Sequence, residues 1–347
     1  MSTSATSTHL TPIAPSLQNF RGFRIKHSRI AQMMNELNTL IYPGSQDSIL
    51  LVCGPSGVGK SMLSHHIVNS AVAEATQQMN EDAGVIPAIY VEAPSSGESD
   101  FSWRLFYQQI LSQLGDDMSM PKHEFGIDAQ TGRFVRPRGP SGNSLAALRT
   151  AVERGLRERG TNFLVIDEAA HIIRQTRRHR LEIQLDTLKS LANQCGTQII
   201  LVGSYDLYQL VSLSAQLARR IHVLHFERYR EDNDSDIRAF KACVQKFQDA
   251  MPDLWGQQLV QYSSALHENT LGCIGTLRDV LVRAAKLANT DGKWSVDTLR
   301  RALLTEAQRL KILDEICDGE AAINPGLTRT MPSAPGIKRR SSERKAA

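Results

Sequence analysis

The sequence has no long hydrophobic run. Of its 347 residues, 41% are hydrophobic and 22% are charged, an ordinary composition for a globular protein. No apolar stretch approaches the roughly 18 residues that a membrane-spanning helix requires. The first ten residues also lack the basic and apolar regions of a secretory signal. We therefore expect a cytoplasmic protein with no membrane partner, in which residues 1–20 form a disordered polar leader.

The number and spacing of the cysteines do not suggest that they form pairs. Its five cysteines are scattered, odd in number and nowhere spaced as C-x-x-C: Cys53, Cys195, Cys243, Cys273 and Cys317. This pattern argues against both a disulfide framework and a zinc site. We expect most of them to be small buried apolar residues.

Features of sequence-specific DNA recognition are missing as well. Aromatic residues make up only 6% of the chain, and no stacking platform, helix-turn-helix or zinc finger stands out. The net charge is +4, but the residues from Leu327 onward carry +5, which leaves −1 for the rest. Because the globular part is nearly neutral, any binding of nucleic acid must depend on local patches.

The most informative feature is a glycine-rich loop at residues 54–61, which fits G-x-x-x-x-G-K-[ST]. An apolar strand is predicted before it, at 48–53, and a helix after it, at 62–79. In this setting backbone amides and the helix N-terminus bind the phosphates of a nucleotide. Lys60 would reach the β- and γ-phosphates and Ser61 would complete a Mg²⁺ site. The predicted ATP-binding residues of this loop are Gly54, Pro55, Ser56, Gly57, Val58, Gly59, Lys60, Ser61 and Met62.

The surrounding pattern predicts an α/β fold in residues 21–231. A first helix is predicted at 23–42, and apolar strands at 86–92, 161–167, 197–203 and 222–226 join the one at 48–53. Helices are predicted at 102–114, 144–159 and 181–194, and a loop or small hairpin at 115–143. Strands that alternate with helices predict a parallel sheet covered on both faces.

The remaining chain shows no strand pattern. Helical segments at 233–250, 253–268, 272–290 and 295–316 predict a small all-helical domain over residues 232–319. From there to residue 347, and most clearly from Asn324, the composition of Pro, Gly, Ser and basic residues predicts a disordered basic tail.

Two carboxylates follow the apolar strand at 161–167. Asp167 would hold Mg²⁺ through water, and Glu168 would polarise the attacking water. A solvated turn is the alternative interpretation of this pair.

Three further positions match places that act on the γ-phosphate in ring ATPases. Ser204 follows the strand at 197–203, where such enzymes usually have Asn; a simple Gly-Ser turn is the alternative. Arg219 and Arg220 occupy the position from which an arginine finger reaches the γ-phosphate in the neighbouring subunit. The alternative is that they are surface arginines that favour the dipole at a helix end. Arg278, after Gly-x-x-Gly-x-x, would face the phosphates from a helix of the second domain.

With these residues the chain resembles the AAA+ superfamily over residues 25–310. Walker A lies at 54–61, Walker B at 163–168, the arginine finger at 219–220, and sensor 2 is Arg278. The resemblance implies a P-loop core with a parallel five-stranded sheet flanked by helices, plus a small C-terminal all-helical lid.

Within that superfamily the chain looks most similar to the TniB/TnsC-type regulators of DNA transposition. The features are the helix before Walker A, the segment 166–171 with the basic stretch after it, and the segment 272–284. The resemblance implies an ATP-dependent homo-oligomer, a ring or helical filament on double-stranded DNA. It would link a TniQ-like target-selection protein or guide-RNA complex to a transposase, and hydrolysis would disassemble it. Ser204 and the insertion at 115–143 depart from the family pattern.

Two basic patches could contact DNA phosphates without reading bases. One lies in the insertion and one follows Walker B: Lys122, Arg133, Arg136 and Arg138, then Arg174, Arg177 and Arg178. A solvated charged face or an inter-subunit salt-bridge surface is the alternative.

Two other functions stay open. An initiator or helicase-loader ATPase shares Gly-x-x-Arg at sensor 2 but usually adds a winged-helix DNA reader, for which little chain remains after residue 319. A signalling ATPase would use the nucleotide to gate protein contacts without DNA.

Overall fold

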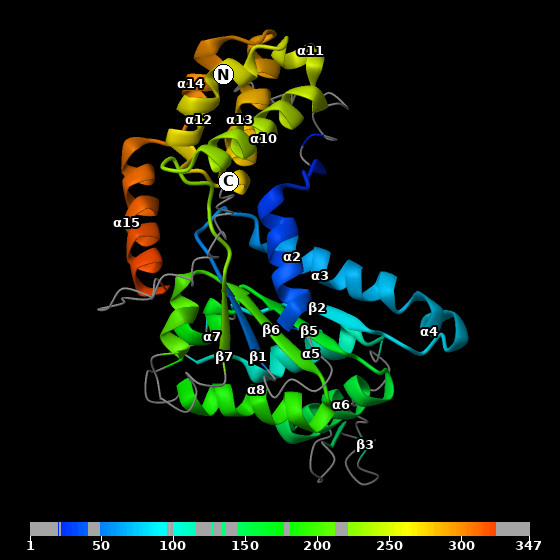
Figure 1. Ribbon diagram of the computed structural model, residues 1–347. Helices are drawn as coiled ribbons and strands as arrows, with labels where there is room; N and C mark the ends of the chain where they lie inside the picture. Colours follow the sequence, from blue (N-terminus) through cyan, green and yellow to red (C-terminus); the bar gives the residue numbers. More distant parts are fainter. Residues whose placement is uncertain are drawn as a thin grey trace, which may run out of the picture.

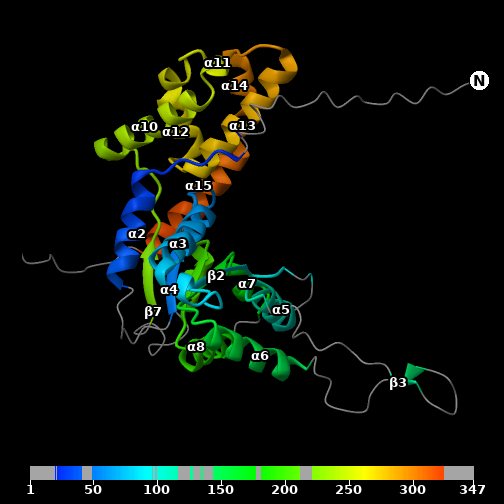
Figure 2. The ribbon, with the colours of Figure 1, turned by 90° about the vertical axis from the view of Figure 1, so that its right-hand side faces the viewer.

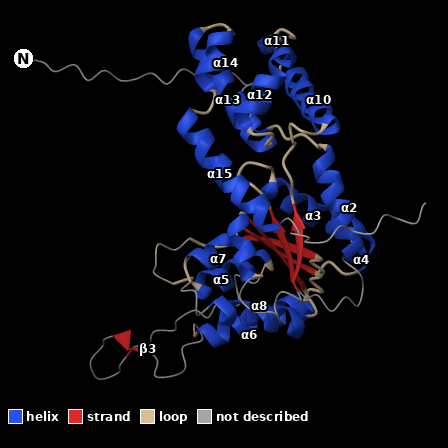
Figure 3. Ribbon diagram, turned by 60° about the vertical axis from the view of Figure 1, so that its left-hand side comes forward, coloured by secondary structure: helices blue, strands red, loops and turns tan. Residues whose placement is uncertain are grey.

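A single parallel sheet organises the first part of the chain. In the computed structural model its five strands have the order β2-β5-β6-β1-β7, and every pair is parallel (Figure 3). The strands are β1 (Ile49–Cys53), β2 (Ala88–Glu92), β5 (Phe163–Asp167), β6 (Gln198–Gly203) and β7 (Ile221–His225). The predicted five-stranded parallel sheet is confirmed. The residues described are 20, 22–40, 49–95, 97, 100–115, 126–127, 134–135, 144–176, 181–211 and 221–323.

Helices cover both faces of this sheet. All five residues of β1 are buried, and alternate ones enter different core clusters, Leu50 on one face and Leu51 on the other. Because helices pack on both faces of the sheet, every β1 side chain is buried, as its continuous apolar run predicted. The helices on the Leu50 face are α2 (Ser28–Leu40) and α3 (Lys60–Glu74); those on the Leu51 face are α5 (Trp103–Gln113), α6 (Leu145–Glu158) and α8 (Leu181–Cys195).

Several short elements lie between the longer helices and strands. Within residues 115–143 the structure describes one antiparallel pair, so the hairpin expected there is confirmed. Ser144 caps α6, as predicted, by accepting a hydrogen bond from the amide of Ala147 at 3.2 Å. The short elements are α4 (Thr76–Glu81), β3 (Gly126–Ile127), β4 (Phe134–Val135), α7 (Ala170–Arg174) and the 3₁₀ helix η3 (Tyr205–Leu210).

A helical unit, called the lid below, follows the sheet and stands above it (Figures 1 and 2). Its core is rich in aromatic residues, with Trp255, Phe240 and Phe247 fully buried. Its elements are α10 (Asp234–Ala250), α11 (Pro252–Trp255), the 3₁₀ helix η4 (Leu259–Tyr262), α12 (Ser263–Thr270), α13 (Ile274–Asp291), α14 (Val296–Ala302) and α15 (Glu306–Ile323). No helix in the described ranges is long and apolar enough to cross a membrane.

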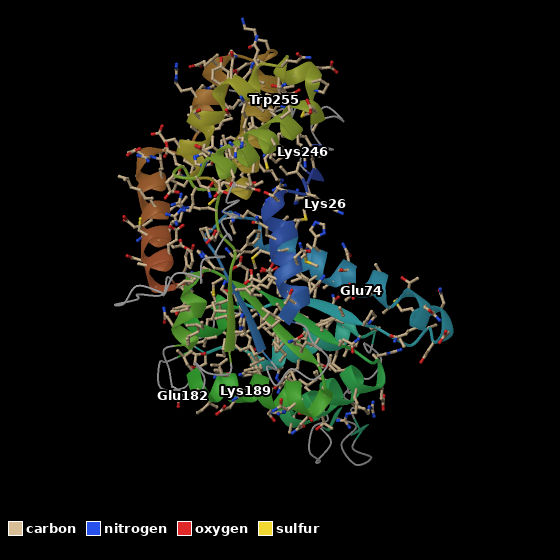
Figure 4. The ribbon with its side chains drawn as sticks, viewed as in Figure 1. Lys26, Glu74, Glu182, Lys189, Lys246 and Trp255 are labelled. Atoms are coloured by element: carbon tan, nitrogen blue, oxygen red, sulfur yellow. The ribbon has the colours of Figure 1, made fainter. Side chains whose placement is uncertain are left out.

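The helix predicted from Phe23 is wrong at its start, because α2 begins at Ser28. The residues before it are drawn into the lid instead: Phe20 and Phe23 pack against Phe247, with ring centroids 6.1 and 6.0 Å apart. The Nζ of Lys246 on α10 also donates to the carbonyl oxygen of Lys26 at 2.8 Å (Figure 4). Residues 22–27, called the strap below, therefore connect the lid to α2.

Three other predicted helices are each divided. The helix expected at 62–79 is α3 and α4, which meet at Ala75. The segment 253–268 breaks at Gly256, whose positive φ of 52° ends α11. The segment 295–316 breaks after α14, where the side chain of Asn269 bonds both the N–H and the C=O of Leu304.

The last helix returns to the sheet. α15 runs to Ile323, past the boundary expected at residue 319. Gly319 lies directly against the ring of Tyr205 in η3, and Arg228 pairs with Glu320 at 2.8 Å. α15 thus contacts η3, the element that follows β6. Figure 1 shows α15 running from the lid down toward the sheet.

Candidate nucleotide site

The glycine-rich loop connects β1 to α3 and leaves the start of α3 open to an anion. Gly57 and Gly59 have positive φ values of 77° and 116°, a conformation that favours glycine. Gly59 is the N-cap of α3, and no side chain caps the first turn there. The first backbone amides of this 15-residue helix are therefore without a side-chain acceptor. Such a helix start fits a phosphate group.

Lys60 lies in the first turn of α3 and folds back over the loop. Its Nζ donates to the carbonyl oxygens of Gly54 and Pro55, at 3.1 and 2.8 Å. Burial lowers the pKa of Lys60, and the carboxylate of Glu168 opposes that shift. The ammonium group is thus held at the loop, near the Walker B carboxylates.

Asp167 and Glu168 lie at the carboxyl end of β5. The Asp167 side chain is buried, and its Oδ1 accepts a hydrogen bond from the Glu168 amide at 2.8 Å. Its Oδ2 accepts one from the Tyr90 hydroxyl at 3.2 Å. Glu168 has a positive φ of 48°, which turns the chain sharply at the strand end. The two carboxylates therefore differ, since Asp167 is enclosed and Glu168 lines a cavity.

The lid touches the loop directly through the start of α13. The amide of Thr276 donates to the carbonyl oxygen of Gly57 at 3.1 Å. A Cβ at Gly275 would lie 2.5 Å from that same oxygen, so only glycine permits the contact. This close approach brings Arg278, one turn further along α13, to the cavity above the loop.

That cavity, called the nucleotide pocket below, has a volume of about 240 Å³. It brings together residues predicted from the sequence: Ser56, Gly57, Gly59, Lys60, Ser61, Met62, Glu168 and Arg278. Burial lowers the pKa of Arg278, whose guanidinium also pairs with Asp279 at 3.1 Å. Gly54, Pro55, Val58 and Asp167 belong to the loop and strand beneath the pocket and are not among the described lining residues.

Sequence reasoning missed the other wall of the nucleotide pocket. It comes from the strap, from α2 and from lid residues of α10 and α13: Arg24, Ile25, His27, Ile30, Phe247, Ile274 and Asp279. One available signal was Ser28, a favourable helix start just before the apolar spacing of Ile30 and Met33. It would have left residues 23–27 outside the helix, free to pass over the loop.

Ser204 and Arg174 form a separate polar group beside the pocket. Ser204 follows β6, whose last residue, Gly203, accepts a hydrogen bond from the amide of Gly54 at 3.3 Å. Arg174 pairs with Asp206 at 2.5 Å and donates to the Ser204 hydroxyl at 3.3 Å. Ser204 is thus near the loop, and Arg174, predicted to contact DNA, is engaged by an acidic neighbour.

The remaining predicted positions lie outside the described residues. They are the candidate arginine finger and most of the two basic patches: Arg219 and Arg220, then Lys122, Arg133, Arg136, Arg138, Arg177 and Arg178. Residues 1–19 of the expected leader and most of the expected tail, residues 324–347, are also outside the described part. The expected leader is wrong at Phe20, which is buried in the core of the lid.

His27 links the strap, the loop and the segment between β7 and the lid. Its Nδ1 is 3.0 Å from the Tyr229 hydroxyl, its ring stacks on Phe226, and its Nε2 lies 3.8 Å from a Cβ built on Gly59. Burial, aided by the charge of Lys246, lowers the pKa of His27 to about 4. The imidazole is therefore neutral at physiological pH.

Stability should consequently fall on acidification. The pKa of His27 is 6.5 when unperturbed and about 4 in the fold, so the unfolded chain binds the proton more readily. Preferential protonation of His27 in the unfolded chain should lower the free energy of unfolding by about 3 kcal/mol as the pH falls from 6.5 to 4. Urea unfolding at several pH values should show a shallower acid loss for His27→Phe, which keeps the stack on Phe226. An unchanged pH slope in the variant would contradict this assignment.

The residues present fit Mg²⁺ held jointly with phosphate. No group of three or more His, Cys, Asp or Glu side chains in the described ranges could hold a metal alone. Mg²⁺ is usually bound through one or two carboxylates, waters and substrate phosphates instead of an all-protein cage. The Ser61 hydroxyl and the enclosed Asp167 carboxylate are the groups predicted to contribute here.

Comparisons with known proteins agree with this geometry. Residues 43–211 match the family model of the AAA domain. The Aeropyrum pernix ORC2 protein is similar in structure, with a TM-score of 0.52 and 14% identity over 82% of this chain and 69% of that chain. This similarity shows the fold, the P-loop fold of AAA+ proteins.

Two other solved structures are less similar. A Walker-type ATPase of Pyrococcus abyssi has a TM-score of 0.49 and 15% identity, covering 87% of this chain and 75% of that chain. Domain III of the Thermotoga maritima replication initiation protein DnaA has a TM-score of 0.40 and 17% identity, covering 88% and 99%. No curated protein matches the chain.

Proposed function

We propose that this protein is a cytoplasmic ATPase of the AAA+ type that assembles on double-stranded DNA and regulates transposition. Nucleotide binding and hydrolysis are supported by one observation: three elements contribute to the lining of a single pocket. The uncapped start of α3, Glu168 of β5 and Arg278 of the lid all line it. Amides, a general base and a mobile cation are the parts that phosphoryl transfer requires.

In the proposed reaction each residue has one task. The amides of residues 57–61 and Lys60 would hold the phosphates, and Ser61 and Asp167 would hold Mg²⁺, which when bound would supply neutralisation of the phosphate charge. Glu168 accepts a proton from the attacking water, and Arg278 stabilises the same phosphates from the lid. The Aeropyrum pernix ORC2 protein was solved in ADPNP and ADP complexes, which supports the nucleotide assignment.

Nucleotide state would control assembly through the lid. Arg278 lines the pocket in the arrangement in which Gly275 and Thr276 rest on the loop. A triphosphate would favour this closed arrangement, and the diphosphate would release it. Arg219 or Arg220 would complete the site of a neighbouring copy, so that hydrolysis takes place between subunits.

The trans role of the arginines has its own test. Subunits carrying Arg219→Ala and Arg220→Ala keep their own loop, whereas Lys60→Ala subunits keep their arginines. Mixing the two inactive variants should restore part of the hydrolysis rate if the arginines act in trans. No recovery at any mixing ratio would leave the pair with a structural role.

The transposition role is supported by sequence resemblance in segments 166–171 and 272–284. In the structure, Gly275 of the second segment lies against the carbonyl oxygen of Gly57 in the loop. The proposed partners are a transposase and a TniQ-like selector, and the basic patches are the proposed phosphate contacts on DNA.

An initiator or loader ATPase is a second candidate, because the ORC2 similarity covers 82% of this chain. Both candidates bind duplex DNA, so the partner separates them. Purified protein with DNA and ATP should retain a co-expressed transposase from the neighbouring reading frames. Retention of a replicative helicase in its place would favour the loader.

The assembly claim is tested by electron microscopy with duplex DNA. With a non-hydrolysable ATP analogue the protein should form rings or filaments, and with ADP these should disappear. Binding to DNA should weaken steeply as salt rises, as expected for phosphate contacts. If no DNA binding occurs at low salt with ATP, the protein belongs to the signalling class that gates protein contacts only.

A further inference from the structure

Tyr90 lies on β2, next to the strand that ends in Asp167. In the parallel register Tyr90 pairs with Val165, and Glu92 pairs with Asp167. Side chains alternate between the faces of a strand, so Tyr90, Val165 and Asp167 share the face covered by α3. The phenol therefore points along the sheet toward the Walker B carboxylate.

Neutral donors hold both oxygens of Asp167. The Tyr90 hydroxyl donates to Oδ2 at 3.2 Å, and the Glu168 amide donates to Oδ1 at 2.8 Å. Burial, followed by the charge of Asp167, raises the pKa of Tyr90, so its hydroxyl keeps the proton that it donates. Within the described ranges no ion pair involves Asp167, which makes these two hydrogen bonds the contacts that orient it.

The same tyrosine also contacts the helix that follows the loop. Its ring stacks on His65 of α3, with centroids 4.5 Å apart and planes at 29°. α3 begins with Lys60 and Ser61, one turn before His65. Tyr90 thus touches the element that carries Ser61 and, through its hydroxyl, the carboxylate at the end of β5.

We propose that Tyr90 is a positioning residue for the magnesium site: its ring fixes α3 through His65 while its hydroxyl fixes the Asp167 carboxylate. It thereby sets the spacing between the two protein groups that hold the metal. This inference rests on the proposed Mg²⁺–nucleotide function. Hydrogen-bond partners of metal ligands commonly change metal affinity by about 10–100-fold when they are lost.

Tyr90→Phe tests this proposal, because it removes the hydroxyl and keeps the ring on His65. Calorimetry should measure ADP binding in Mg²⁺ and in EDTA, without any hydrolysis. We expect the ratio of the ADP affinity in Mg²⁺ to the ADP affinity in EDTA to be about tenfold smaller in the variant than in the wild type. ADP affinity in EDTA should match the wild type.

Two further variants separate positioning from packing. Tyr107→Phe removes the hydroxyl of a buried tyrosine in the core cluster on the opposite face of the sheet, and should leave the Mg²⁺ effect unchanged. His65→Ala keeps the hydroxyl but removes the stack, and should reduce the Mg²⁺ effect in part. His65→Phe should restore it.

The results separate a failure of the proposed role of Tyr90 from a failure of the proposed Mg²⁺–nucleotide function. If the wild type binds ADP more tightly with Mg²⁺ and Tyr90→Phe does so equally, the positioning role is overturned and the function stands. If the wild type itself gains nothing from Mg²⁺, the proposed function fails and the role of Tyr90 fails with it.

Discussion

Glu168→Gln should lower the rate of ATP hydrolysis by about a thousandfold while leaving ATP binding nearly unchanged, because a positioned general base contributes about 10²–10⁴ in rate. The amide has the size of the carboxylate but cannot accept the proton of the attacking water. Glu168 lines the nucleotide pocket, whereas Asp167 beside it is enclosed. Release of phosphate and binding of a fluorescent ATP analogue measure the two effects separately.

Glu92 supplies the matched control for that variant. It ends the neighbouring strand, directly beside Asp167 in the register, and its side chain is exposed and does not belong to the pocket lining described here. Glu92→Gln should therefore keep the wild-type rate. Hydrolysis by Glu168→Gln within a few-fold of the wild type would show that another group activates the water.

Gly275→Ala should uncouple the lid from the loop. The added Cβ would lie 2.5 Å from the carbonyl oxygen of Gly57 and 3.1 Å from its carbon, both backbone atoms that cannot move aside easily. Overpacking of this kind costs about 1–3 kcal/mol. The ratio of closed to open states then falls by about 5- to 150-fold, and ATP affinity should fall by about fivefold or more.

Hydrogen exchange identifies the cause of that loss. The Thr276 amide donates to Gly57 in the closed arrangement, so its protection should drop in Gly275→Ala while the core of the lid stays protected. Gly22→Ala serves as the control, because a Cβ there meets nothing within 4 Å. Full ATP affinity in Gly275→Ala would contradict a role of lid docking in binding.

The central parts of the fold and site follow from short-range sequence patterns. The loop at 54–61 needs only its own residues, a strand before it and a helix after it, and all three are local. The alternation of strands with helices predicted a parallel sheet, and the nearly continuous apolar run at 161–167 is typical of a strand covered on both faces. Asp167 and Glu168 were found for the same reason, as polar residues at the end of such a run.

Features that depend on distant contacts were missed. The strap leaves its helical pattern because Phe20 and Phe23 pack on Phe247 and Trp255 of the lid, far along the chain. Tyr90 looked like an ordinary strand residue, since its partner Asp167 is 77 residues away.

Arg174 shows what a local charge pattern leaves out. It was grouped with a basic run as a DNA contact, and in the fold it pairs with Asp206 of the 3₁₀ helix after β6. A charge pattern in sequence does not reveal which residues already have partners in the fold.

ATP binding by the wild type and by Lys60→Ala, measured by calorimetry in Mg²⁺ with a non-hydrolysable analogue, tests the central claim most directly. Lys60 lies in the loop beside the Walker B carboxylates and lines the nucleotide pocket. We predict saturable one-to-one binding by the wild type and its loss in Lys60→Ala, with both proteins equally folded by circular dichroism. Equal binding by the two proteins, or none by the wild type, would contradict the account.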